Sequence, residues 1–146
     1  MNSETSFNRI SNKILNAILL ISIGGFIDAS YLTAEHFLGN VPACSFLSGC
    51  ETVTQSVYAT IGPIPIALLG VLFYLSIFVL TFLYKELESK KIFSKLFLLA
   101  STGFAVTLFL LFIQAFVLHA FCIYCLTSAA TSISIFTLVF ISRKRA

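Results

Sequence analysis

Four long apolar stretches constrain this chain more than any other feature of its sequence. A hydrocarbon core about 30 Å thick needs roughly 20 helical residues to cross it, and each stretch is long enough. Composition agrees, because 58% of the residues are hydrophobic and only 10% are charged, against about 25% charged in soluble domains. We therefore predict an all-α fold, an integral membrane four-helix bundle that forms a single domain over residues 1–146. The spans are expected at about residues 14–33, 64–84, 96–119 and 122–141.

The basic residues predict how these spans are oriented. All nine Lys and Arg precede the first span, lie between the second and third, or follow the fourth. Basic residues are enriched in cytoplasmic loops. The prediction is a multi-pass plasma-membrane protein with both termini in the cytoplasm and with an outer loop at residues 34–63. This distribution accounts for the net charge of +3 without a nucleic-acid partner. The first span lacks a small-residue cleavage site, so we expect it to be retained.

All four cysteines fall on the predicted outer side, where disulfides can persist. Cys44 and Cys50 lie in the outer loop, and Cys122 and Cys125 form a Cys-x-x-Cys motif that opens the fourth span. This motif recurs in thiol–disulfide enzymes. We interpret the four thiols as redox-active. The alternatives are inert buried cysteines, a static disulfide pair, and a four-cysteine zinc site, which the wide Cys44–Cys50 spacing disfavours.

The second half of the outer loop predicts a short helix that covers the outer mouth of the bundle. Ser48 and Glu51 fit a capping box, which places Cys50 in the first helical turn. Unpaired N–H groups at a helix N-terminus favour a thiolate. Cys122 has a similar position at the start of the fourth span, with Cys125 about one turn deeper. A lipid-soluble oxidant could reach Cys125 at this membrane boundary.

The residues around the cysteines resemble the vitamin K epoxide reductase family. The resemblance covers the whole membrane core. Many bacterial members carry a fused thioredoxin-like domain, whereas this chain ends at Ala146 and resembles the stand-alone form, which meets its redox partner in trans. The resemblance is carried by Asp28-Ala-Ser-Tyr31-Leu-Thr, Cys44-x5-Cys50-x5-Ser56, Gly62-x4-Ala67-x2-Gly70 and Cys122-x2-Cys125.

The resemblance implies a path for two electrons. Cys122 and Cys125 would be the active-site pair, with Cys125 facing a quinone and Cys122 exchanging disulfides. Cys44 and Cys50 would be a shuttle pair. A reduced thioredoxin-like or DsbA-like protein would attack the shuttle disulfide, Cys50 would attack Cys122, and Cys125 would pass the electrons to ubiquinone or menaquinone. Ser56 matches a family serine or threonine that binds the quinone or orients the loop; otherwise it is an ordinary surface serine.

One departure from the family bears on the substrate. Animal members hold vitamin K with a tyrosine four residues after the second active-site cysteine, and here that position is Ala129. A respiratory quinone is therefore the better prediction. The alternatives are a vitamin K epoxide or quinone reductase driven by a dithiol, and a non-catalytic membrane scaffold with structural disulfides. A DsbB-like oxidase is disfavoured, because its Cys-x-x-Cys lies in the first outer loop.

Three further polar residues lie near the spans without an assigned role. Asp28 is a functional acid within the membrane, a cap of the outer loop or a residue in interfacial water. Gln114 is expected to bridge helices. His119 is either interfacial or a proton carrier.

Overall fold

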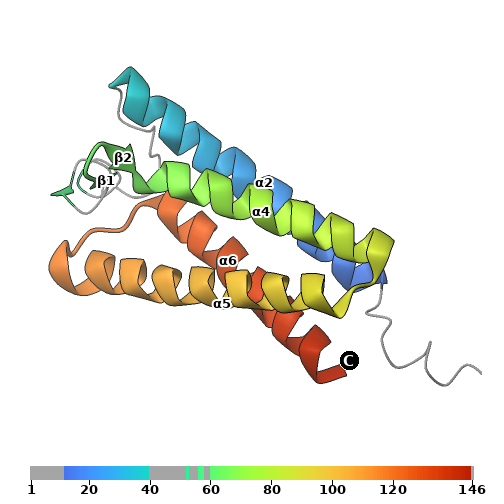
Figure 1. Ribbon diagram of the computed structural model, residues 1–146. Helices are drawn as coiled ribbons and strands as arrows, with labels where there is room; N and C mark the ends of the chain where they lie inside the picture. Colours follow the sequence, from blue (N-terminus) through green and yellow to red (C-terminus); the bar gives the residue numbers. More distant parts are fainter. Residues whose placement is uncertain (1–11, 40–51, 53–55, 58–59, 146) are drawn as a thin grey trace, which may run out of the picture.

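Four long helices make up most of the fold (Figure 1). The computed structural model describes residues 12–39, 52, 56–57 and 60–145. Of residue 145 it describes only the backbone. The predicted all-α four-helix bundle is confirmed. The helices are α2 (Asn12–Leu38), α4 (Ile66–Leu87), α5 (Lys90–Phe112) and α6 (Ile123–Arg145), and a π-helical turn, η2 (Ile113–Val117), continues α5.

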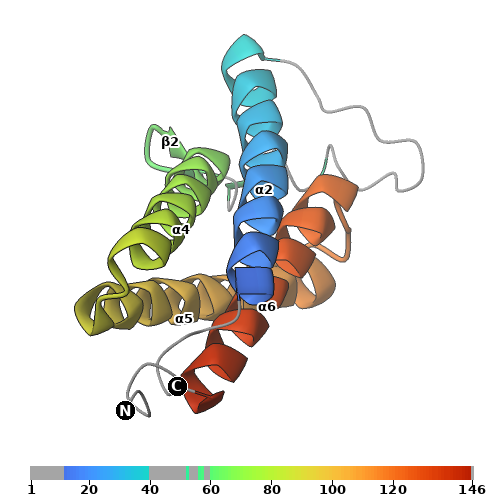
Figure 2. The same ribbon diagram turned by 90° about the vertical axis from the view of Figure 1, so that its right-hand side faces the viewer.

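Each long helix packs mainly against two others. Helix α2 packs on α4 and α6, and α5 packs on the same two helices from another side (Figure 2). All four are long and apolar enough to cross a membrane, so the protein is a multi-pass membrane protein. The start of α2, the turn from α4 to α5 and the end of α6 lie at one end of the bundle (Figure 1).

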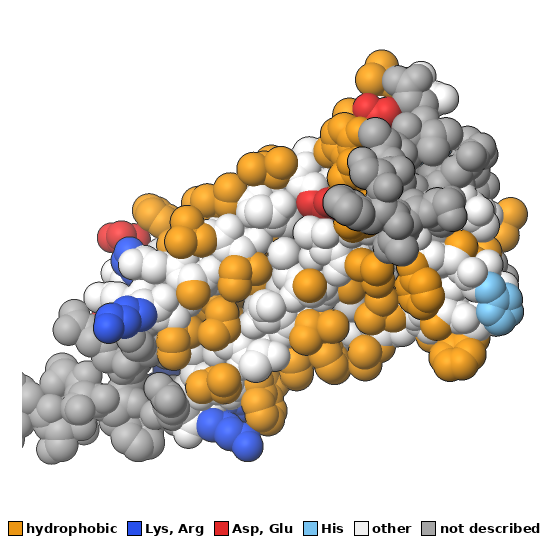
Figure 3. All heavy atoms as spheres, turned by 180° about the vertical axis from the view of Figure 1, so that it is seen from behind, with side chains coloured by type: hydrophobic (Ala, Val, Ile, Leu, Met, Phe, Trp, Pro, Cys, Tyr) orange, Lys and Arg blue, Asp and Glu red, His pale blue; other side chains and the backbone are white. Residues whose placement is uncertain are grey.

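The Lys and Arg side chains of the described chain gather at that same end. Figure 3 shows them separated by a broad, largely apolar surface from a histidine near the opposite end. One of them is fixed between helices, because Lys85 Nζ donates a hydrogen bond to Asn16 Oδ1 at 3.0 Å. We call this the basic end and the opposite one the cysteine end, since Cys122 and Cys125 lie there.

Two helices are longer than the apolar stretches alone suggest. Helix α2 continues to Leu38, through residues that were expected to lie in the outer loop, and α5 already begins at Lys90. Polar residues at a membrane surface do not by themselves end a helix, because the helix makes its backbone hydrogen bonds within its own segment. Helix α2 stops only where Gly39 adopts a positive φ of 73°.

A small hairpin not predicted from the sequence precedes α4. Strand β1 (Thr60–Ile61) pairs antiparallel with β2 (Ile64–Pro65), and Gly62 turns the chain with a φ of 61°. Most of the predicted loop helix, together with Cys44 and Cys50, lies outside the described residues. Ser56 is described and lies in a bend rather than in a helix, because the chain turns here towards β1.

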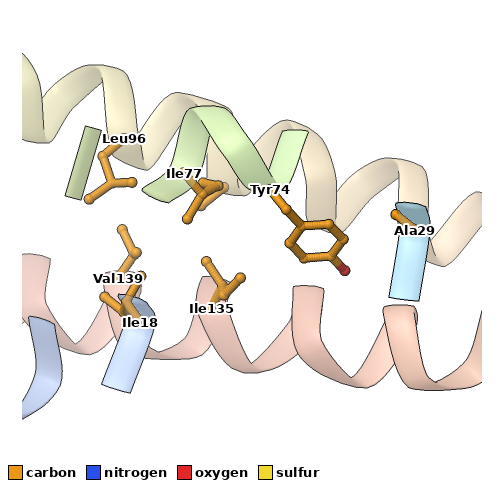
Figure 4. Close-up of a cluster of buried hydrophobic side chains, with 8 residues drawn as sticks. Ile18, Ala29, Tyr74, Ile77, Leu96, Ile135 and Val139 are labelled. Carbon is orange, nitrogen blue, oxygen red and sulfur yellow. The ribbon is translucent and has the colours of Figure 1, made fainter. Parts of the chain in front are cut away.

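The core towards the basic end is mostly apolar. Side chains from all four helices meet there in one cluster (Figure 4). Inside a membrane such a cluster stabilises the fold mainly through close packing. Its fully buried members include Ile18, Ile77, Leu96, Ile135 and Val139.

Two glycines allow a pair of rings from α4 to fit between neighbouring helices. A Cβ atom at Gly25 of α2 would overlap the Tyr74 ring, and one at Gly103 of α5 would overlap the Phe73 ring. The two rings also contact each other edge to face, with centroids 5.1 Å apart. Small residues that let membrane helices approach closely are a common means of association. These glycines therefore fix where α4 sits.

Candidate active site

The connection from α5 to α6 is built from irregular backbone. In the π-helical turn, Leu118 N–H donates to the Ile113 carbonyl oxygen at 2.9 Å, and Ala120 N–H donates to that of Gln114 at 3.1 Å. His119 takes a left-handed φ of 50°. The third span therefore ends at Val117, before the predicted His119, because the wider turn and the left-handed residue reverse the chain. Such π-turns are frequent at functional sites.

Gln114 connects this turn to the cysteine motif. Its side chain is buried, and its Oε1 accepts a hydrogen bond from the backbone N–H of Cys122 at 3.3 Å. The carbonyl oxygen of Cys122 accepts the helical bond from Leu126 N–H at 2.9 Å, so Cys122 is the N-cap residue of α6. Gln114 thus fixes the start of α6. This contact between η2 and the first residue of the next helix is more local than the bridge between helices expected from the sequence.

The two thiols of the motif are free and hydrogen-bonded to each other. Cys122 precedes the membrane-spanning part of α6 and is fully buried, packed against Leu118, Ala120 and Tyr124. Cys125 is partly exposed. The hydrogen bond with Cys125 lowers the pKa of Cys122 from 9.0 to about 7, against the opposing effect of burial; backbone hydrogen bonds from residues 124 and 125 add to the lowering.

This arrangement has the two parts that thiol–disulfide exchange needs. Exchange proceeds by attack of a thiolate on a disulfide sulfur, and the attacking thiol works best with a pKa near the ambient pH. Cys122 meets that condition. Cys125 is within hydrogen-bonding distance of it, so it can resolve a mixed disulfide. The pair can therefore alternate between a dithiol and a disulfide.

A polar cluster that sequence reasoning missed lies one turn deeper in the bundle. Tyr74 of α4 donates a hydrogen bond to the Ser128 carbonyl oxygen at 2.7 Å, and its hydroxyl lies 2.6 Å from Thr131 Oγ1. Ser132 of α6 accepts a bond from Thr107 of α5 at 3.0 Å. Figure 4 shows the Tyr74 ring reaching from α4 towards α6. The spacing of hydroxyl residues along α6 was the available sequence signal.

Asp28 lies on α2 between this polar cluster and the cysteine motif. Its charge acts electrostatically on Tyr74 and on both Cys122 and Cys125. Above it, Tyr31 of the same helix contacts Tyr124 of α6, with ring centroids 5.2 Å apart. The outer part of α2 is thereby held against the first turn of α6.

The structure thus brings together part of the predicted site. Cys122 and Cys125 lie side by side, and Asp28 and Gln114 join them from α2 and η2. Cys44 and Cys50 lie outside the described residues, so their pairing stays a prediction. Ser56 is half-buried, and its predicted contact with a quinone is also untested.

Comparison with known proteins agrees with this geometry. The model of the vitamin K epoxide reductase family matches residues 16–140, which reach from α2 to α6 and include the Cys-x-x-Cys motif. A comparison with curated proteins gave no match. The match covers most of the chain, and the spanning helices and paired thiols fit it. The protein is therefore a membrane redox enzyme that belongs to the vitamin K epoxide reductase family.

Proposed function

We propose that this protein oxidises an extracytoplasmic thioredoxin-like or DsbA-like protein and passes the electrons to a quinone, and so supports disulfide formation. The observation that carries the proposal is the hydrogen-bonded pair of free thiols at the start of α6, in which Cys122 has a pKa of about 7. A nucleophilic thiolate with an adjacent resolving thiol is what repeated exchange requires.

The charge distribution supports an outer position for this pair. Cys122 and Cys125 belong to the start of α6, which lies towards the end of the bundle opposite the turn from α4 to α5 (Figure 1), whereas the described Lys and Arg side chains gather at the end with that turn (Figure 3). By the positive-inside rule, the basic end faces the cytoplasm and the cysteine end faces outwards. The protein is then a plasma-membrane protein with cytoplasmic termini, and its thiols meet exported proteins.

The different exposure of the two thiols supports different partners for them. Cys122 is fully buried, so the thiol of a folded soluble protein cannot reach its sulfur without an intermediary. A relay through Cys44 and Cys50 meets this need, with Cys50 attacking Cys122. Cys125 is partly exposed among apolar residues at the membrane boundary, which fits a lipid-soluble acceptor.

The chemistry divides between the chain and its cofactor. Members of this family use quinones, and a bound quinone supplies the two-electron sink. The residues of this chain perform the sulfur steps. Cys122 forms a mixed disulfide with the shuttle cysteine, and Cys125 is released as the free thiol nearest the acceptor. Ser56 is the proposed loop residue that binds the quinone or orients the loop.

The residue one turn beyond Cys125 bears on which quinone is used. Ala129 is buried and offers only a methyl group. A vitamin K site of the animal type would need a hydroxyl at this position, so we propose ubiquinone or menaquinone as the acceptor. Reduction of vitamin K epoxide is the second candidate, and a test with both substrates separates the two.

The deciding experiment measures quinone reduction by the full-length protein in detergent. The electron donor is a reduced periplasmic thioredoxin-like protein, and the variants are Cys125→Ala and Cys44→Ala. We expect turnover in the parent and none in either variant, while a dithiol small enough to bypass the shuttle restores turnover in Cys44→Ala only. Turnover that persists in Cys125→Ala would overturn the proposal. Loss of folding in both variants would instead favour the structural-disulfide scaffold.

A further inference from the structure

Asp28 occupies one stripe of α2 together with two residues that contact other helices. Gly25, Asp28 and Tyr31 are three residues apart, so they lie on the same face of the helix. Gly25 lies under the Tyr74 ring, and Tyr31 contacts the Tyr124 ring. Asp28 therefore faces the interior between these two contacts, at the level where α2 meets the first turns of α6.

One oxygen of this carboxyl group has no partner there. Oδ2 of Asp28 is buried, and among the described residues none forms a hydrogen bond with it. A charged group within a membrane bundle is costly, and such residues usually serve proton or ion chemistry. The described Lys and Arg residues lie at the other end of the bundle, so none of them neutralises it (Figure 3).

The ionisable groups within electrostatic range of Asp28 on the helices packed against α2 come from α4 and from the start of α6. Tyr74 projects from α4, and Cys122, Tyr124 and Cys125 belong to the start of α6. The charge of Asp28 acts on all four of them. On its own helix, Tyr31 is the next titratable residue towards the cysteine end. Among the described residues around the two thiols, Asp28 thus supplies the carboxylate.

The thiol pair needs a group that removes a proton. Cys122 is the thiol with the lowered pKa, and the hydrogen bond between the sulfurs leaves the remaining proton on Cys125. That proton has to leave before the Cys125 sulfur can join a disulfide. We propose that the Asp28 carboxylate accepts the proton of the Cys125 thiol and delivers it to the reduced quinone. The quinone as final acceptor of the proton rests on the proposed function.

The step balances in atoms and electrons. The S–H bond of Cys125 breaks, and its proton moves to Asp28. A bond forms between the Cys122 and Cys125 sulfurs, and the pair of electrons that the two sulfurs release goes to the quinone. Asp28 returns its proton to one quinone oxygen. Full reduction of a quinone would need a second proton, which water would supply in place of the one lost when Cys122 ionised.

The test isolates this pair in the full-length chain by Cys44→Ser and Cys50→Ser. The prereduced protein is oxidised between pH 5 and 9 by hydroxyethyl disulfide or by a short-chain ubiquinone analogue. The variants are Asp28→Asn, which keeps shape but removes the base, and Asp28→Glu, which keeps a carboxylate. Glu35→Gln, two turns further along α2, is the matched control. Rapid acid quenching and thiol labelling report disulfide formation.

We expect Asp28→Asn to slow closure of the Cys122–Cys125 disulfide about a hundredfold at pH 7, at the low end of general acid–base effects. Glu35→Gln should match the parent, and Asp28→Glu should recover part of the rate. A purely structural role would not move the second readout, the ultraviolet absorbance of the thiolate. The pH midpoint at which the Cys122 thiolate absorbance appears should be lower in Asp28→Asn, because the carboxylate charge that opposes ionisation of Cys122 is gone.

The two oxidants separate the inference from the proposed function. Equal rates of closure with hydroxyethyl disulfide in Asp28→Asn, Glu35→Gln and the parent would overturn the role of Asp28, whatever the quinone does. A parent that the disulfide oxidises but the quinone does not would overturn the proposed electron acceptor. In that case the disulfide rates still decide whether Asp28 takes the proton.

Discussion

The two ends of this bundle differ in how their helices are held together. Towards the basic end, the buried contacts are mostly apolar, with fully buried Ile77, Ile135 and Val139 in regular helices, and the Lys85–Asn16 hydrogen bond lies at the surface. Towards the cysteine end, the helices meet through hydroxyls, an amide, a carboxylate and two thiols. Irregular backbone also gathers there, in the π-turn and at His119.

The difference indicates a division between stability and chemistry. A core of close-packed aliphatic side chains contributes packing energy and has no group that can react. Polar groups inside a membrane protein add less stability and are usually kept for function. Tyr74 lies at the border of the two regions, since its ring joins the apolar cluster and its hydroxyl bonds to α6. Changes on either side of it should therefore affect different properties.

The largest expected effect is the loss of electron transfer when the nucleophile is removed. Cys122→Ser should reduce thiol oxidation to background, because a hydroxyl at this position cannot exchange with a disulfide. Thermal unfolding in detergent should change little, since the two side chains have similar shape. Oxidation assays with a small disulfide in the Cys44→Ser/Cys50→Ser background, run beside the unfolding measurement, check both statements. Retained activity would mean that another thiol attacks first.

The pKa of Cys122 should differ by about two units between protein that has Cys125 and protein that lacks it. In Cys44→Ser/Cys50→Ser protein, its thiolate absorbance should rise with pH through a midpoint of about 7. Cys125→Ala removes the main cause of the lowering, so the midpoint should return towards 9.0. The thiolate form, and with it reactivity, is gained as pH rises and lost below the midpoint. Equal midpoints would assign the effect to the helix start instead.

A cavity in the apolar region should affect stability without changing the chemistry. Ile135→Ala should lower the free energy of unfolding by about 2 kcal/mol, the low end for such truncations, because lipid reduces the transfer part of the loss. The oxidation rate per folded molecule should stay at the parent value. Denaturation in mixed micelles and the thiol assay measure the two quantities. A changed oxidation rate would show that the two regions are coupled.

A matched glycine pair tests the border between the regions. Gly25→Ala places a methyl group against the Tyr74 ring, so α2 and α4 must separate or the ring must move, at a cost of about 1–3 kcal/mol. Gly24→Ala on the same helix meets nothing within 4 Å and should be neutral or slightly stabilising. Unfolding measurements compare them. Similar stabilities would mean that the ring moves freely.

The smallest effect concerns the amide that fixes the start of α6. Gln114→Ala leaves the buried N–H of Cys122 without its acceptor, which should destabilise the protein by about 1 kcal/mol, the low end for a lost acceptor because the bond is long at 3.3 Å, and slow disulfide exchange. Gln114→Glu keeps an acceptor oxygen and serves as the control for the hydrogen bond. Hydrogen exchange at the Cys122 amide reports the contact directly. Unchanged protection in Gln114→Ala would exclude a positioning role.

Much of the fold could be predicted because the membrane limits the choices. The spacing of apolar stretches predicted four helices, and their approximate bounds follow from the need to satisfy backbone groups in lipid. The end of the third span was misplaced, because apolarity continues through His119 while the backbone does not. The β1–β2 hairpin was missed as well, since residues 60–65 carry no alternating pattern.

The candidate site shows the same limit. Cys122 and Cys125 could be found from spacing alone, since three residues along a helix bring them together. The contacts of Asp28, Tyr74 and Gln114 could not, because each joins parts of the chain whose relative placement depends on how helices pack. A polar residue in an apolar stretch signals some role, but its partner is set by the rotation of each helix about its own axis.

The sequence by itself determined the membrane class, and it predicted the orientation and a redox role for Cys122 and Cys125, since these depend on hydropathy, charge and local spacing. Only the tertiary structure decided that Cys122 is buried while Cys125 is partly exposed, and that a carboxylate lies within electrostatic range of both. The physical reason is that burial and electrostatic contact depend on distances between helices. Those distances were set by close approaches such as Gly25 against Tyr74.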